Sequence, residues 1–193
     1  MEAHALIFTD LVDSTAVTER LGDARAASVL AEHDRIARAL LSQHGGREID
    51  HSDGFFLLFE DPVRAAAFAL DYHAALDVLG LRSRAGFHVG PVTLRENPAD
   101  DVARGAKPIE VEGIAKPLAA RVMSLARGGQ TLLTQAARAA LGHALTDAAS
   151  AENDDVHRAK VLESCRPWSG CSTAHSARRP PSEAAGGGHC GYF

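Results

Sequence analysis

Two short, wholly apolar runs, Ala5–Phe8 and Phe55–Phe59, constrain the fold more than any other feature of the sequence. Each run is too short for a helix with a buried face, and polar or turn-forming residues bound it, which is typical of a buried strand. A chain of 193 residues is long enough to enclose such strands in a sizeable core. The sequence therefore predicts a soluble globular domain that contains a sheet.

Helical spacing and further strand segments alternate along the rest of the chain. Asp53-Gly54 is a hairpin signal that joins two of the strands. Ser14 or Thr15 is expected to cap the first helix, and Pro62 begins a later one at the position where proline costs least. The expected helices are 16–21, 24–44, 62–79, 114–126 and 135–141; the expected strands are 5–8, 47–52, 55–59, 82–94 and 131–134, with a surface loop at 95–108.

A hairpin between two crossover helices predicts an α+β fold on the ferredoxin-like βαββαβ plan, with an antiparallel or mixed sheet and helices packed on one face. The helical and strand patterns decay near residue 147, after which proline, glycine, serine and alanine dominate. We therefore expect a folded domain at 1–147 and a poorly ordered C-terminal tail at 148–193.

Composition excludes several classes of protein. The formal net charge of −5 argues against a nucleic-acid partner, because such proteins need a basic face to neutralise phosphates. A nucleotide enzyme is still allowed, since bound metal ions supply positive charge locally. No stretch approaches the roughly 20 apolar residues that span a bilayer, and no signal peptide is visible, so a cytoplasmic location without a membrane partner is expected. The three cysteines all lie in the expected tail, which argues against a disulfide-framed fold.

Two aspartates stand at the ends of the apolar strands. Asp10 directly follows the first strand, and Asp53 lies at the tip of the hairpin. If the two strands are neighbours in one sheet, both carboxylates come to the same edge. Paired carboxylates on rigid strands suit hard divalent cations such as Mg²⁺ or Mn²⁺.

Five segments stand in a fixed order along the chain. They are Leu6–Thr15, Gly45-Gly46-Arg47 with Ser52-Asp53-Gly54-Phe55, Arg84–Gly90, Gly113–Arg121 and Gly128–Leu133. Their sequences resemble the motifs of class III adenylate and guanylate cyclases, which are nucleotidyl cyclases, and the resemblance covers about residues 5–142. It implies that 1–147 is a nucleotidyl cyclase catalytic domain with the cyclase homology fold.

The resemblance implies a role for each site residue. Asp10 and Asp53, with the backbone carbonyl of Leu11, would hold two Mg²⁺ or Mn²⁺ ions for in-line displacement at phosphorus. Arg121 would act as the catalytic residue by stabilising charge at the α-phosphate. The loop at Val12, Asp13, Ser14 and Thr15 would offer backbone amides to the β- and γ-phosphates of the nucleoside triphosphate substrate.

The family's sites form between two antiparallel domains, so a chain with one such domain is expected to act as a homodimer with two equivalent sites.

The sequence departs from the family pattern at the base-reading positions. Adenylate cyclases of this class carry a lysine a few residues before the second metal aspartate, and none stands there in this chain. Counting from either end of the segment gives Ile49 or Asp50 at that place, with His51 as a third candidate. The second base-reading residue, usually Asp or Thr, corresponds to Glu110.

A second departure lies one helical turn before Arg121. The family usually has an asparagine at this position, and Pro117 replaces it here. Proline has neither a side-chain amide nor a backbone N–H, so the contact that positions the ribose is lost.

Three readings of function follow from these departures. The first is a purine cyclase that makes cAMP or cGMP and pyrophosphate. The second keeps the reaction but changes the base, because the missing lysine and compact chain resemble bacterial pyrimidine cyclases, which make cUMP or cCMP in antiphage signalling. The third is a degenerate, non-catalytic cyclase-like binding module, which Pro117 favours and which the retained Asp10, Asp53 and Arg121 disfavour.

Overall fold

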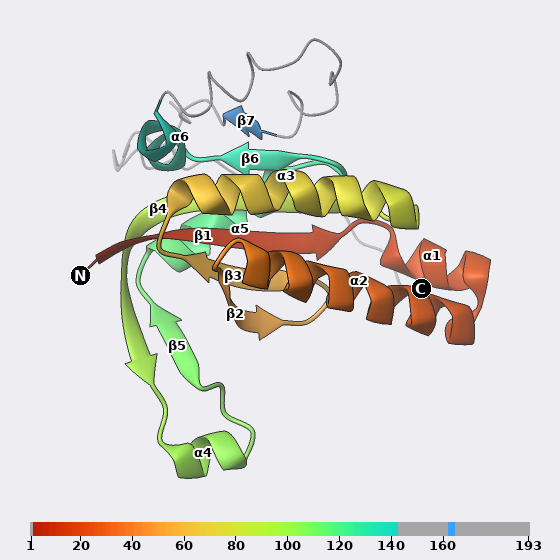
Figure 1. Ribbon diagram of the computed structural model, residues 1–193, viewed down its shortest axis with the longest axis horizontal. Helices are drawn as coiled ribbons and strands as arrows, with labels where there is room; N and C mark the ends of the chain where they lie inside the picture. The colour runs from red at the N-terminus through yellow and green to blue at the C-terminus, as the bar shows by residue number, and fades with distance from the viewer. Residues whose placement is uncertain (1, 143–161, 165–193) are drawn as a thin grey trace, which may run out of the picture.

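The computed structural model describes residues 2–142 and 162–164 (Figure 1). The helices and strands follow the expected order closely. The strands are β1 (Glu2–Leu11), β2 (Arg47–His51), β3 (Phe55–Phe59), β4 (Ser83–Glu96), β5 (Ile109–Glu112), β6 (Thr131–Leu133) and β7 (Leu162–Ser164); the helices are α1 (Ser14–Leu21), α2 (Asp23–Gln43), α3 (Pro62–Leu79), α4 (Ala99–Ala103), α5 (Ala115–Leu125) and α6 (Gln135–Leu141).

The strands form one mixed sheet in the order β2-β3-β1-β4-β6-β7, and β5 pairs with the far end of β4. β1 is antiparallel to both β3 and β4, whereas β6 is parallel to β4 and β7 is parallel to β6. The expected α+β class and the mixed sheet are confirmed. The neighbouring places of β1 and β3 bring the residues that follow β1 beside the turn that precedes β3.

β1 lies in the middle of the sheet, and layers on both sides bury it. Ala5, Leu6 and Ile7 have no exposed surface. Because side chains alternate along a strand, Ala5 and Ile7 pack with the α3 residues around Phe68, whereas Leu6 joins a second apolar cluster with Ala119 of α5. Burial on both faces explains why this strand is a continuous apolar run.

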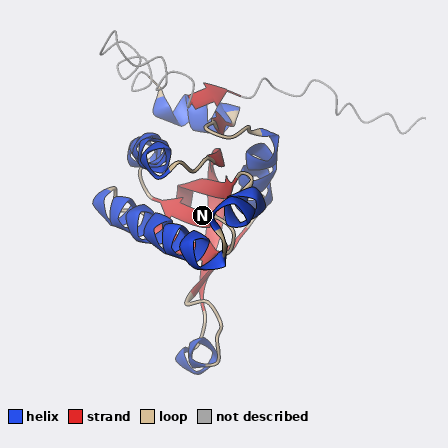
Figure 2. Cartoon of the chain, turned by 90° about the vertical axis from the view of Figure 1, so that its right-hand side faces the viewer, coloured by secondary structure: helices blue, strands red, loops and turns tan. Residues whose placement is uncertain are grey.

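Helices therefore cover both faces of the sheet, and the expectation that they pack on one face is wrong (Figure 2). The helix on the second face is α5, which crosses β4 closely at Gly86. A Cβ on Gly86 would overlap the backbone of Ala119 and Met123, so only glycine allows this approach. The amphipathic sequence of α5 predicts that one side of the helix is buried, but it does not predict which face of the sheet the helix covers.

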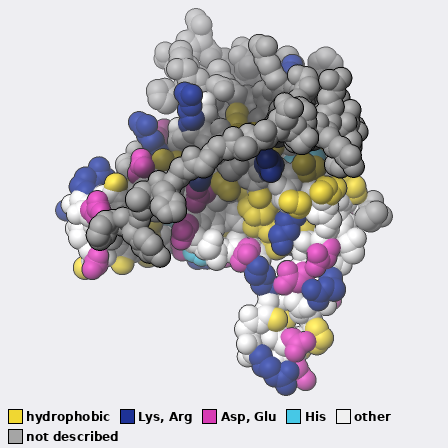
Figure 3. Space-filling view, turned by 180° about the vertical axis from the view of Figure 1, so that it is seen from behind, with side chains coloured by type: hydrophobic (Ala, Val, Ile, Leu, Met, Phe, Trp, Pro, Cys, Tyr) yellow, Lys and Arg dark blue, Asp and Glu magenta, His cyan; other side chains and the backbone are white. Residues whose placement is uncertain are grey.

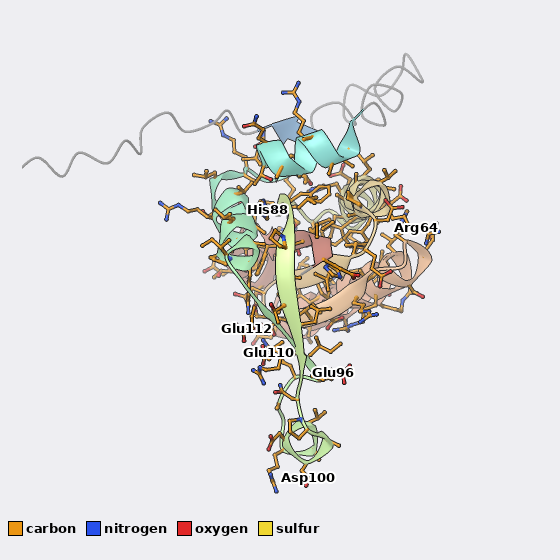
Figure 4. All side chains as sticks on the ribbon, turned by 90° about the vertical axis from the view of Figure 1, so that its left-hand side faces the viewer. Arg64, His88, Glu96, Asp100, Glu110 and Glu112 are labelled. Carbon is orange, nitrogen blue, oxygen red and sulfur yellow. The ribbon has the colours of Figure 1, made fainter. Side chains whose placement is uncertain are left out.

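A long two-stranded ribbon, which we call the arm, projects from the body (Figure 1). The arm comprises residues 93–112: the end of β4 pairs antiparallel with β5, from Thr93 opposite Glu112 to Glu96 opposite Ile109, and α4 forms its tip. Asp100 lies at that tip, far from the sheet (Figure 4). The expected loop at 95–108 therefore contains a short helix and continues a strand that the turn-forming residues concealed.

β7 extends the sheet beyond the expected end of the folded domain at residue 147. The remaining residues of the expected tail, 148–161 and 165–193, lie outside the described part of the chain. Within the described part, no helix is both long and apolar enough to cross a bilayer.

Candidate active site

The backbone brings Asp10, near the C-terminal end of β1, beside Asp53, in the turn between β2 and β3. The Leu11 amide donates to the Asp53 carbonyl at 3.4 Å. Gly54 lies so close to β1 that a Cβ there would overlap the Thr9 carbonyl and the Asp10 Cα. The tip of the β2–β3 hairpin is therefore packed directly on the backbone of Asp10, and the sequence prediction that both aspartates reach one edge matches this arrangement.

Hydroxyl groups of buried residues hold the end of β1 and the β2–β3 hairpin in place. The Thr9 hydroxyl accepts from the Phe55 amide at 2.9 Å, and the Ser83 hydroxyl donates to the Asp10 carbonyl at 3.0 Å. The Tyr72 hydroxyl interacts with both of these hydroxyls, and burial raises the pKa of Tyr72 to about 12. This network fixes the backbone on which both aspartates stand.

The Tyr72 hydroxyl also meets a buried histidine on α2. His33 contacts Tyr72 through Nε2 at 2.8 Å and Asp34 through Nδ1 at 2.9 Å. Burial is the main cause that lowers the pKa of His33, so the ring is neutral at neutral pH. Sequence reasoning missed this supporting layer because no local pattern relates residues so far apart in the chain.

Asp10 carries an ionic partner. Arg84, its direct neighbour across the β1–β4 pairing, donates from Nε and Nη2 to Asp10 Oδ2 at 2.9 and 2.6 Å. The Asp10 side chain remains about a quarter exposed. The guanidinium thus occupies one carboxylate oxygen of Asp10 and leaves a partly exposed carboxylate at the site.

The donor set at this edge fits a hard divalent cation. It offers the carboxylates of Asp10 and Asp53 and the carbonyl of Leu11. Mg²⁺ is commonly held by one or two carboxylates while water and substrate phosphates complete its shell. The described residues contain no cluster of three or more His, Cys, Asp or Glu side chains, so this part of the chain offers no all-protein cage of the kind that holds structural zinc.

The loop after β1 turns sharply into α1. Asp13 has φ 58° and ψ 31°, and it is the one non-glycine residue with positive φ in the described segments. The helix begins at Ser14, so the expected cap at Ser14 or Thr15 is wrong: Asp13 occupies that place, and both hydroxyl residues lie in the first turn.

Not every amide of this loop is available for phosphate. The Val12 amide donates to the Arg82 carbonyl at 2.8 Å, so the expected phosphate contact from Val12 is lost to the backbone. The first-turn amides at Ser14 and Thr15 have no acceptor within the helix, as at any helix N-terminus. Those amides carry the partial positive charge of the α1 N-terminus.

Arg121 lies on the outer face of α5, away from the sheet. Ala115 and Ala119 form the buried face of this helix, while Ile114, Leu118 and Leu125 are 70%, 41% and 66% exposed. Arg121 follows the spacing of the exposed set and is itself exposed. Figure 3 shows apolar side chains gathered on this side of the molecule, with charged side chains toward the arm.

Pro117 fits α5 without cost to the helix. It is the third residue of the helix, and the first backbone bond of α5 runs from the Leu118 amide to the Ile114 carbonyl at 3.2 Å. An N–H at position 117 would have no acceptor within the helix, so proline removes nothing there.

The base-reading candidates on β2 face two different ways. A register shift between Glu48 and Asp50 marks a β-bulge, in which two consecutive side chains share a face. Ile49 is buried in the second apolar cluster, on the α5 side of the sheet. His51 faces the opposite side, where its Nε2 lies 3.1 Å from Asp34 of α2.

Asp50 has a partner that sequence reasoning missed. The Lys107 ammonium, in the segment of the arm between α4 and β5, donates to Asp50 Oδ2 at 2.5 Å and lowers the pKa of that carboxyl. Glu110, three residues further along, stands opposite Arg95 in the arm and is labelled with Glu112 in Figure 4. A contact between residues 57 positions apart leaves no signal in a single sequence.

Comparison with known proteins agrees with this fold. The sequence matches no protein-family model and none of the curated proteins with which it was compared. An adenylate cyclase from Trypanosoma brucei in its monomeric state is 22% identical, with a TM-score of 0.67 over 77% of this chain and 80% of that one.

Two further structures are similar over a comparable span. The adenylyl cyclase CyaB from P. aeruginosa is 18% identical, with a TM-score of 0.66 over 72% of this chain and 80% of that one. The guanylate cyclase domain of RhGC from Catenaria anguillulae, in complex with GTP, is 17% identical, with a TM-score of 0.64 over 73% of this chain and 82% of that one. The chain therefore has the fold of class III adenylate and guanylate cyclase catalytic domains.

Proposed function

We propose that the chain is a nucleotidyl cyclase, which converts a nucleoside triphosphate into a 3′,5′-cyclic nucleotide and pyrophosphate. One observation carries the proposal: the hairpin tip that bears Asp53 packs on the backbone of Asp10, a few residues before the N-terminus of α1. The likeness to adenylate and guanylate cyclase domains supports the same reaction class.

The reaction needs little covalent chemistry from the protein. The 3′-oxygen of the ribose forms a bond to the α-phosphorus while the bond from that phosphorus to the bridging oxygen of the β-phosphate breaks. The hydroxyl proton leaves to solvent, and pyrophosphate departs with the bridging oxygen. Divalent ions, when bound, make the 3′-hydroxyl more acidic and stabilise the triphosphate charge.

Each site residue has a task in this scheme. Asp10 and Asp53, with the Leu11 carbonyl, hold the divalent ions. The first-turn amides of α1 at Ser14 and Thr15, reached through the bend at Asp13, bind the terminal phosphates.

Arg121 stabilises the charge that builds at the α-phosphate, and it acts from a second copy of the chain. Its position on the outer face of α5, among exposed apolar side chains, supports this assignment. A homodimer that buries the exposed apolar side chains of α5 would present Arg121 of one protomer to the aspartates of the other.

The base is proposed as a purine by default, which gives cAMP or cGMP. A pyrimidine cyclase that makes cUMP or cCMP is the alternative, because β2 has no lysine at the base-reading position. A non-catalytic binding module is the second class of function, and Pro117 one turn before Arg121 favours it.

The test is a product assay with each of ATP, GTP, CTP and UTP, in Mn²⁺ and in Mg²⁺, followed by chromatography and mass spectrometry. We expect one preferred triphosphate to yield a cyclic nucleotide and an equal amount of pyrophosphate. Asp53→Asn should lower that yield at least about 100-fold, whereas Asp100→Asn at the tip of the arm should leave it unchanged. No cyclic product from any triphosphate would contradict the proposal.

A further inference from the structure

Two histidines from different elements meet at one carboxylate oxygen of Asp34. His33, its neighbour on α2, approaches Asp34 Oδ1 with Nδ1 at 2.9 Å, and His51 of β2 approaches the same oxygen with Nε2 at 3.1 Å. A carboxylate oxygen only accepts hydrogen bonds, so each of these ring nitrogens carries a proton. Asp34 is therefore a common anchor for a buried side chain of α2 and for a strand of the sheet.

The proton on Nδ1 of His33 sets the direction of the hydrogen bonds beyond it. Because the buried ring is neutral, its Nε2 has no proton and accepts from the Tyr72 hydroxyl at 2.8 Å. The Tyr72 oxygen is then left to accept from the Thr9 hydroxyl, and the Thr9 oxygen accepts from the Phe55 amide at 2.9 Å. The bonds run in one direction, from the Phe55 amide to Asp34.

This chain of hydrogen bonds begins beside both metal aspartates. Thr9 directly precedes Asp10 in β1, and Phe55 follows Asp53 by two residues. The bond between Thr9 and Phe55 therefore joins the strand that carries one aspartate to the hairpin that carries the other. Any change in the position of Tyr72 is felt at this joint.

The contact with His51 reaches the same hairpin from its other strand. His51 pairs with Phe55 across β2 and β3, and the centroids of their rings lie 4.5 Å apart. The Ser52 amide donates to the Gly54 carbonyl at 2.9 Å and closes the turn that carries Asp53. The bond from His51 to the anchor on α2 therefore holds the strand that leads into this turn.

Packing alone does not require these polar groups. His33 and Tyr72 are 2% and 1% exposed, and polar groups buried so deeply cost stability unless each one is hydrogen-bonded. Apolar side chains of similar size would fill the space without that demand, whereas a fully bonded network restricts a core to one arrangement. The network joins α2 and α3 to the strands that carry the metal aspartates, so it restricts the distance between those aspartates.

We infer that Asp34 is a positioning residue of the metal site. It holds β1 through the chain of His33 and Tyr72, and it holds the hairpin through His51. It thereby fixes the distance between the two metal aspartates. That distance matters because Mg²⁺ demands nearly ideal octahedral geometry from its oxygen ligands. The inference rests on the proposed function, which assigns both aspartates to metal binding.

The Mn²⁺ affinity of the full chain, measured by calorimetric titration without nucleotide, is the main readout. Asp34→Ala removes the shared oxygen, and Tyr72→Phe removes only the hydroxyl that His33 contacts. Asp71→Ala is the matched control, because the Asp71 carboxylate also contacts a histidine, His44 Nε2, at 2.9 Å. That contact lies at the C-terminal end of α2, roughly three helical turns from Asp34.

We expect Asp34→Ala and Tyr72→Phe each to bind Mn²⁺ about tenfold more weakly, as when a group that orients a metal ligand is removed. The double variant should bind no more weakly than Asp34→Ala alone, because both changes interrupt one chain of contacts. Asp71→Ala should keep the wild-type affinity, also where urea titrations show the same loss of stability as in Asp34→Ala. If Asp34→Ala does not fold, Tyr72→Phe carries the comparison, because its ring still fills the core.

Nuclear magnetic resonance of the isotope-labelled chain tests the direction of the bonds without metal. His33 should carry its ring proton on Nδ1 and none on Nε2, and the spectrum of His33→Gln identifies its signals among those of the 10 histidines. In Asp34→Ala the preference for Nδ1 should be lost. A role for Asp34 in stability alone predicts no link between this preference and Mn²⁺ affinity.

Wild-type Mn²⁺ affinity in both Asp34→Ala and Tyr72→Phe would overturn the inference, as would an equal loss of affinity in Asp71→Ala or a ring proton on Nε2 of wild-type His33. The proposed function is judged separately, by cyclic product from the natural triphosphates. A chain that makes product while both variants bind Mn²⁺ normally keeps the proposed function and loses Asp34 as a positioning residue. A chain whose Mn²⁺ affinity depends on Asp34 but which makes no product loses the proposed function and retains the positioning role.

Discussion

Arg84 and Asp10 are paired across neighbouring strands, and the guanidinium donates twice to one oxygen of a carboxylate that we assign to metal binding. A cation from the protein therefore stands where a divalent ion would also bind. The pair keeps the Asp10 side chain in one orientation and neutralises it. It also sets a competition between Arg84 and the metal.

Replacement of Arg84 by methionine should strengthen Mn²⁺ binding about tenfold, because removal of one positive charge close to Asp10 relieves the competition. Calorimetric titration of the chain with Mn²⁺ measures this directly and does not depend on turnover. Arg84→Lys keeps the charge and should stay near the wild-type affinity. Weaker Mn²⁺ binding in Arg84→Met would show that Arg84 serves to orient Asp10 rather than to compete.

Gly54→Ala should destabilise the hairpin and abolish metal binding, because the new Cβ overlaps the Thr9 carbonyl and the Asp10 backbone. We expect urea titrations to show a free energy of unfolding lower by about 1–3 kcal/mol, as for other overpacked sites. Gly128→Ala is the matched control, since its Cβ would meet the side chains of Val12 and Arg82 at ordinary contact distances of 3.4 and 3.5 Å. Equal stability in the two variants would contradict the close packing of Gly54 on β1.

Pro117→Asn restores the residue that class III cyclases usually carry one turn before the catalytic arginine. We expect kcat to rise several-fold, because an amide side chain regains the ability to position the ribose. Stability should fall only slightly, by about 0.4–1 kcal/mol, since proline here restricts the unfolded chain without breaking a helix bond. An unchanged kcat would mean that other residues of this chain position the ribose. Pro117→Ala is the control, because it removes the proline without adding a side-chain amide.

Stability should fall on acidification because the fold buries a neutral histidine. His73 contacts Thr131 at 3.0 Å, and burial lowers its pKa from 6.5 to about 4. Between these values the unfolded chain binds more protons than the folded one, so the free energy of unfolding decreases as the pH falls from 6.5 to about 4. The contribution of this one residue is about 3 kcal/mol.

Urea unfolding at pH 7 and at pH 4.5 measures the effect, and His73→Gln should reduce the difference between the two pH values. His33 and His88 also have lowered pKa values because of burial and act in the same direction, so the variant should lose only part of the dependence. If the free energy of unfolding of His73→Gln keeps the full wild-type pH dependence, protonation of His73 is not its cause.

The sequence was informative where structure is local. The helix α3 begins at Pro62, with Asp61 accepting from the Val63 amide at 2.8 Å, and ends at Gly80 with φ 68°, as the capping residues predict. The hairpin at Asp53-Gly54 and the apolar strands on either side of it also follow from local pattern. Turns and helix caps depend on contacts between residues only a few positions apart, so a single sequence is enough to predict them.

What the sequence could not supply depends on distant contacts. The placement of α5 on the second face, the pairing of Arg84 with Asp10 and the pairing of Lys107 with Asp50 each join segments that no local pattern relates. The bulge at Ile49 is of the same kind, because its register is set by the partner strand β3. These contacts decide which side chains share the site.

The central claim is that one catalytic site combines the aspartates of one protomer with Arg121 of another. Mixing the inactive variants Asp53→Ala and Arg121→Ala tests it most directly, with cyclic nucleotide formation as the readout. If subunits exchange freely, mixed dimers contain one intact site, and about a quarter of the wild-type activity should return. No recovery in dimers shown to be mixed, or full activity of Arg121→Ala alone, would contradict the account.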